Sequence, residues 1–108
     1  MRVLFDNGTP RGVAGALPEH DVEEARARGW DTLGNGELLD AAEAAGFQVF
    51  VTTDRNLRHQ QNLRGRRIAI VVLGSARWKL IRKRLPQIAR TVAAGTPGSV
   101  VEIEIPLD

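Results

Sequence analysis

The sequence predicts an α/β fold, a three-layer α/β/α sandwich built around a mostly parallel sheet of about five strands. Short apolar runs rich in β-branched residues alternate with amphipathic helical patterns, as in parallel sheets linked by crossover helices. The run at residues 68–73 contains no polar side chain, which is typical of a strand buried on both faces. The 108 residues, 43% of them hydrophobic, suffice for one core, so we expect a single domain over residues 1–108.

The first third of the chain is expected to hold two strands and one short helix. Residues 2–5 form the first strand. Thr9 as an N-cap and Pro10 as the first helical residue predict a helix that begins directly afterwards. Residues 20–25 then form an edge strand, and the segment 26–35 is a loop because it contains glycines.

The middle of the chain predicts a helix, a central strand and a basic turn. Apolar side chains recur on one helical face within residues 37–45, with Asn35 as the N-cap and Gly46 as the C-cap. The run from residue 48 to residue 52 is a buried strand. Residues 55–67 are polar and basic, and we expect a short helix and a turn there.

The last third predicts a strand, a long helix and an edge strand. After the strand at 68–73, residues 76–94 form an amphipathic helix that Pro86 breaks or restarts. Residues 101–105 alternate between apolar and acidic side chains, as in a half-exposed edge strand. Strands and helices thus alternate along the chain, and right-handed crossovers place helices on both faces of the sheet.

Charge is unevenly distributed along the chain. Residues 1–54 carry ten acids and four bases, whereas residues 55–101 carry eleven bases and no acid. A solvated helix face is one explanation; a surface that meets a polyanion or an acidic partner is the other. For the second we expect phosphate contacts from Arg55, Arg58, Arg77, Lys79, Arg82 and Lys83.

The absence of cysteine excludes disulfides, thiolate zinc sites and a cysteine nucleophile. The apolar run after Met1 is too short for the core of a signal peptide, and no stretch is long enough to span a membrane. We therefore expect a cytoplasmic protein that does not contact a membrane. A homodimer is compatible with the sequence.

Two aspartates follow strands of the predicted sheet. Asp6 ends the first strand and Asp54 follows the central one, so parallel strands would bring both to the same edge of the sheet. Carboxylates are ligands for Mg²⁺ or Mn²⁺, and Glu37 or Asp40 on the intervening helix would complete such a site. The alternative is that each aspartate only caps its own turn. Neighbouring amides are expected to support the acids: Asn7, Asn35 and Asn56.

The segments that carry these acids resemble the PIN-like nuclease families, in particular the short relatives of VapC-type toxins. They are Val-Leu-Phe-Asp at residues 3–6, Gly-Glu-Leu-Leu-Asp-Ala-Ala at 36–42 and Val-Phe-Val-Thr-Thr-Asp-Arg-Asn-Leu at 49–57. The resemblance covers about the first sixty residues. It implies an endoribonuclease that uses Mg²⁺ or Mn²⁺ to hydrolyse RNA, and an antitoxin partner. Asp6 and Asp54 match acids of these families directly.

One family acid has no counterpart at its expected position. Asn35 stands where the families open their helix with an acid, which leaves Glu37 or Asp40 as the substitute. A catalytically impaired module that binds nucleic acid or an acidic antitoxin is therefore the alternative function. A phosphoacceptor receiver domain is a weaker alternative, because Asp6 is followed by Asn7 and no lysine lies near the last strand.

Overall fold

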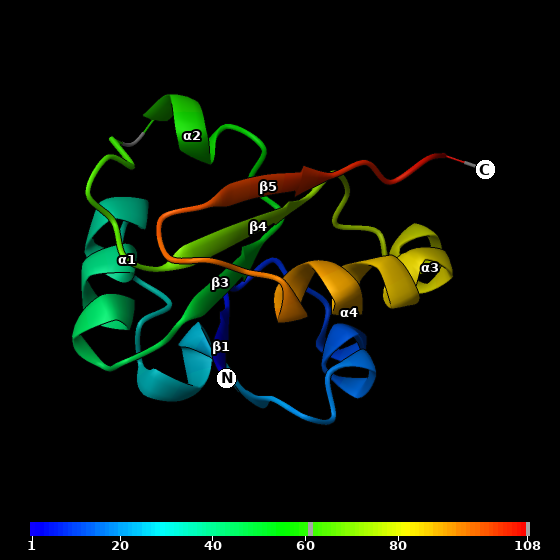
Figure 1. The fold of residues 1–108 in the computed structure, drawn as a ribbon, viewed down its shortest axis with the longest axis horizontal. Coiled ribbons are helices and arrows are strands. Elements are labelled where there is room, and N and C mark those ends of the chain that lie inside the picture. Colours follow the sequence, from blue (N-terminus) through cyan, green and yellow to red (C-terminus); the bar gives the residue numbers. More distant parts are fainter. Residues whose placement is uncertain (61, 108) are drawn as a thin grey trace.

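The computed structural model of the protein describes residues 1–60 and 62–107. Its centre is a five-stranded sheet in the order β2-β1-β3-β4-β5, and every neighbouring pair is parallel. Helices cover both faces, which confirms the predicted three-layer sandwich (Figure 1). The elements in chain order are β1 (Arg2–Phe5), η1 (Arg11–Ala16), β2 (Asp21–Glu24), η2 (Ala25–Arg28), α1 (Asn35–Ala44), β3 (Val49–Thr52), α2 (Leu57–Gln60), β4 (Ala69–Leu73), α3 (Trp78–Ile81), η3 (Arg82–Arg84), α4 (Leu85–Ala93) and β5 (Val100–Ile103).

The strands send alternate side chains to opposite faces of the sheet, because successive residues of a strand point in opposite directions. On β1, Val3 and Phe5 join the core under η1, α3 and α4, whereas Leu4 joins the core under η2, α1 and α2. The strand β4 is buried along its whole length, as its unbroken apolar sequence predicts. Figure 1 shows the two groups of helices on either side of the sheet.

Three local features differ from the sequence-based expectations. The helix after β1 is a 3-10 helix whose N-cap is Pro10, not Thr9, because the Thr9 hydroxyl lies 2.7 Å from Asp6 Oδ1 and 3.0 Å from the Val51 carbonyl. The segment expected as a loop opens with η2, which ends at Gly29 in the left-handed region at a φ of 74°. The helix α1 has Gly34 as its N-cap, so Asn35, the expected N-cap, is instead its first residue.

The last helix is divided, as predicted, because the 3-10 turn η3 separates α3 from α4. Pro86 lies in the first turn of α4, where a proline needs no N–H partner, and the chain therefore restarts its helix there. The longest regular helix within the described ranges is α1, with ten residues, and none of the helices there has the length and hydropathy needed to cross a bilayer.

Candidate functional site

Asp6 and Asp54 lie at the same edge of the sheet and are connected through one buried hydroxyl. The register pairs Phe5 with Val51, so Asp6 and Thr52 follow as the next neighbours at the carboxyl ends of β1 and β3. The Thr52 hydroxyl donates a hydrogen bond to Asp6 Oδ2 and accepts one of 3.0 Å from the backbone N–H of Asp54. Thr52 is only 1% exposed, so this connection is shielded from water.

The second contact of Asp54 comes from α1, in the helical layer formed by η2, α1 and α2. Asn35, the first residue of α1, donates its Nδ2 hydrogen to Asp54 Oδ2 at 3.0 Å. The other oxygen, Oδ1, accepts the backbone N–H of Asn56 at 3.0 Å. The start of α1 and the end of β3 therefore meet at Asp54. We call Asp6, Asn35, Thr52 and Asp54 the carboxyl-edge cluster.

Each aspartate also caps its own turn, as the alternative interpretation predicts, but it does so with only one of its two carboxylate oxygens. Asp6 Oδ1 accepts the backbone N–H of Gly8 at 3.2 Å and lies 2.7 Å from the Thr9 hydroxyl. Asp54 Oδ1 likewise accepts the backbone N–H of Asn56, two residues further along the chain. In both residues Oδ2 instead contacts another element of the fold. The turns thus fix each carboxylate in an orientation that directs one oxygen into the cluster.

The donor chemistry of the cluster fits a hard divalent cation. A carboxylate oxygen has about two acceptor positions. Of the four carboxylate oxygens of Asp6 and Asp54, only Asp6 Oδ1 has two hydrogen-bond donors among the described residues. Asn35 uses its Nδ2 group, which leaves the amide oxygen as a further ligand. Mg²⁺ is commonly held by one or two carboxylates while it keeps several waters. Asp6 and Asp54 match that requirement.

The carboxyl-edge cluster contains only two acidic side chains, Asp6 and Asp54. Across the described part of the chain, no group of three or more His, Cys, Asp or Glu side chains is placed to hold a metal ion. Glu37 Oε1 accepts the backbone N–H of Gly34 at 3.4 Å and so closes the start of α1. Asp40 forms an ion pair of 2.6 Å with Arg66. Both acids are thus engaged outside the carboxyl-edge cluster.

Arg66 connects α1 to the segment that precedes β4. It pairs with Glu43 at 2.7 Å as well as with Asp40, and its side chain is only 16% exposed. Burial raises the pKa of Glu43, but hydrogen bonds from Arg66 and from the backbone N–H groups of Arg67 and Ile68 outweigh burial and hold that pKa below its usual value. We assign these groups to the packing of α1 against the sheet.

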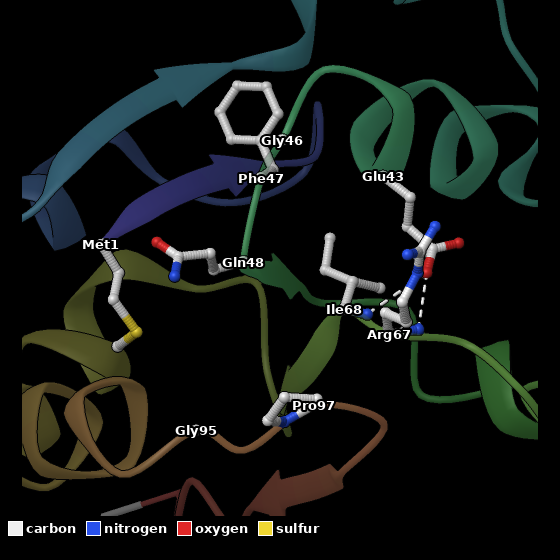
Figure 2. Close-up of a pocket in the computed structure, with 9 residues that line it drawn as sticks. All are labelled: Met1, Glu43, Gly46, Phe47, Gln48, Arg67, Ile68, Gly95 and Pro97. Carbon is white, nitrogen blue, oxygen red and sulfur yellow. Dashed lines mark hydrogen bonds between the residues drawn. The ribbon is translucent and has the colours of Figure 1, made fainter.

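The same glutamate lines a hollow of about 200 Å³ at the opposite edge of the sheet (Figure 2). Met1, Gln48 and Ile68, which line it, each directly precede a strand, so the hollow opens at the amino ends of the strands. Figure 2 shows the hydrogen bonds from the backbone N–H groups of Arg67 and Ile68. Ligands of open parallel sheets collect at the carboxyl ends, where Asp6 and Asp54 lie.

A polar cavity of about 450 Å³ adjoins the end of β3. It is lined by Arg55, Asn56, His59 and Glu102. Arg55 Nη2 lies 3.6 Å from Glu102 Oε2, and the Arg55 side chain is 65% exposed. Arg55 directly follows Asp54 in the chain, but no residue of the carboxyl-edge cluster lines this cavity.

The other cations expected to bind phosphate lie in the helical layer formed by η1, α3 and α4. They belong to α3, to η3 and to Arg77, the residue directly before α3. Arg77, Lys79, Arg82 and Lys83 are all exposed. No carboxylate of residues 1–60 and 62–107 pairs with any of the four. The side chain of Arg58 lies outside what the structure describes.

The supporting amides differ in their placement. Asn35 contacts Asp54 directly, and Asn56 contributes its backbone N–H. Asn7 is exposed and donates its Nδ2 hydrogen to the carbonyl of Asp31 at 3.4 Å, so it contacts a loop instead of an aspartate.

Sequence reasoning did not identify the buried threonines as site residues. Thr52 and Thr9, which is 4% exposed, both contact Asp6. The signal was a hydroxyl residue, Thr52, that ends an otherwise apolar strand two residues before a carboxylate.

No protein-family model matches the chain, and comparisons with curated proteins and with solved structures also gave no match.

Proposed function

We propose that the protein is an endoribonuclease of toxin type that hydrolyses RNA phosphodiesters with Mg²⁺ or Mn²⁺ at Asp6 and Asp54. The observation that carries this proposal is the connection of both carboxylates through the Thr52 hydroxyl, at the carboxyl ends of neighbouring parallel strands. The resemblance of the same segments to PIN-like nucleases agrees with it.

Asp6 and Asp54 would hold the ion, and the amide oxygen of Asn35, whose Nδ2 contacts Asp54, would be a further ligand. A bound divalent ion supplies charge that polarises a phosphoryl oxygen, and it lowers the pKa of a water ligand. Thr52 orients Asp6 and fixes the backbone at Asp54. Arg55 and the cations of α3 and η3 would position the RNA backbone, and such phosphate contacts carry little sequence information.

A second candidate function is binding without cleavage. Asn35 is neutral where an acid is expected, and no third carboxylate joins Asp6 and Asp54 among the residues described. A site with less negative charge binds cations more weakly. In this case the basic surface would hold RNA, or an acidic antitoxin segment, while the carboxyl-edge cluster only stabilises the fold.

RNA cleavage with and without metal tests both candidates. We expect cleavage in Mn²⁺ or Mg²⁺, none in EDTA, and its loss in Asp54→Asn and Asp6→Asn while RNA binding persists. Asp21→Asn is the matched control, since it removes the same charge at the amino end of β2, where the side chain is 69% exposed. RNA binding without cleavage at any metal concentration would favour the second candidate. Equal cleavage by Asp54→Asn and wild type would refute the first.

A further inference from the structure

Trp78 is an exposed aromatic residue fixed against the backbone of another element. It is the first residue of α3 and is 40% exposed, whereas Leu80 and Ile81 anchor the same helix in the core. A Cβ atom built on Gly12 would lie only 2.4 to 2.7 Å from three carbons of the Trp78 ring. The indole therefore lies directly on the backbone of η1, in a contact that only glycine permits.

This contact places Trp78 near the carboxyl-edge cluster. Gly12 lies within the turn closed by the hydrogen bond from the Val13 N–H to the Pro10 carbonyl, directly after Thr9, whose hydroxyl contacts Asp6. The segment from Asp6 to Gly12 is thus held by hydrogen bonds close to the end of β1. α3 itself follows the carboxyl end of β4, so Trp78 approaches the same edge of the sheet from the opposite side to α1.

The surroundings of Trp78 are cationic rather than apolar. Arg77 and Lys79 flank it in sequence and are exposed. Arg11, which precedes its contact residue, is also exposed but pairs with Glu24 at 3.2 Å. The other large apolar side chains exposed in the described ranges, Val101 and Leu107, belong to β5 and the segment after it. A protein-docking patch would group several apolar side chains. One aromatic ring among cations is instead the pattern of surfaces that bind single-stranded nucleic acid.

We propose that Trp78 is a stacking platform for an unpaired base, so that the protein prefers single-stranded RNA. This inference rests on the proposed function in taking RNA as the ligand, but it concerns binding and not cleavage. The bases of a duplex are already stacked on their neighbours and cannot lie against the indole without unpairing. Cations beside the ring would hold the adjacent phosphates.

Tryptophan fluorescence tests the inference directly, because the chain contains two tryptophans and no tyrosine. Trp30→Phe leaves Trp78 as the sole tryptophan, and phenylalanine keeps an aromatic ring against Phe47. We expect single-stranded oligouridylate, added in EDTA, to quench its emission to saturation, and duplex RNA at equal phosphate concentration to leave it unchanged. The matched control is Trp78→Phe, in which Trp30 on the other face of the sheet reports no quenching.

Affinity measurements separate stacking from charge. Trp78→Ala should bind single-stranded RNA about tenfold more weakly with duplex binding unchanged, and Trp78→Phe should lose less. Gly12→Ala displaces the ring without removing it and should reduce quenching, while thermal unfolding monitors the fold of each variant. Unchanged single-strand affinity in a folded Trp78→Ala variant would overturn the stacking role but leave the nuclease proposal intact. Absence of RNA binding by the wild type would overturn both the stacking role and the nuclease proposal.

Discussion

Asn35 Nδ2 lies 3.0 Å from Asp54 Oδ2, so the first residue of α1 is joined to the end of β3 by a side-chain hydrogen bond. The amide stands where an acid would add a third negative charge to Asp6 and Asp54. An amide donor stabilises the Asp54 carboxylate, whereas a carboxylate there would repel it. A neutral amide at the start of α1 is therefore the side-chain partner of Asp54 Oδ2.

Asn35→Asp should make the stability of the protein depend on metal. In EDTA the new carboxylate replaces a hydrogen bond by repulsion, and we expect a loss of about 1 kcal/mol. Mn²⁺ should reverse that loss and raise the melting temperature more than in wild type. Asn62→Asp, the same change in an exposed turn, is the control. Equal non-zero effects of Mn²⁺ on the melting temperatures of Asn35→Asp and wild type would show that residue 35 does not contribute to ion binding, and no effect on either protein would show that the cluster does not bind the ion.

Thr52→Val tests the buried hydroxyl at nearly constant side-chain volume. Without the hydroxyl, Asp6 loses a donor and the Asp54 N–H loses its acceptor. We expect a loss of about 1 to 3 kcal/mol in the free energy of unfolding, measured in urea, together with weaker metal binding. Thr91→Val removes a hydroxyl that bonds to the Gln87 carbonyl on α4 and should cost less. Equal losses in the two variants would contradict a special role of Thr52.

The placement of Asp6 and Asp54 on one edge could be predicted because it depends only on strand order and direction. Apolar periodicity identifies the strands, and parallel pairing brings their ends together. The connection through Thr52 could not be predicted, since it depends on the register between β1 and β3, which packing over the whole sheet determines.

The acids of α1 show a second limit of sequence reasoning. Helical spacing places Glu37 and Asp40 near the same surface, but it does not say which cation meets them. The cation that pairs with Asp40 is Arg66, which lies 26 residues further along the chain. It reaches α1 only because β4, which follows Arg66, packs into the sheet beside β3. The break at Pro86, by contrast, was predictable because the proline ring itself imposes it.

The Glu43 network should make the protein lose stability in acid. Because the folded pKa of Glu43 lies below its ordinary value of 4.5, the carboxylate contributes stability above that value and loses it as pH falls through the folded pKa. Glu43→Gln should therefore unfold more easily at pH 7 and show a shallower fall in the free energy of unfolding below pH 4.5. Urea titrations across this range measure both effects. A Glu43→Gln profile parallel to wild type would contradict this linkage.

The cations of α3 and η3 should act as phosphate contacts with a measurable salt dependence. Removing one contact to single-stranded RNA lowers the slope of log affinity against log salt by about 0.7. We expect this change in Lys79→Ala, with weaker binding of all RNA sequences alike, measured by anisotropy between low and physiological salt. Arg90→Ala is the matched control, because this exposed cation lies near the end of α4, toward the amino edge of the sheet. If both variants change the slope equally, RNA binding is spread over the whole basic half instead of being centred beside the carboxyl-edge cluster.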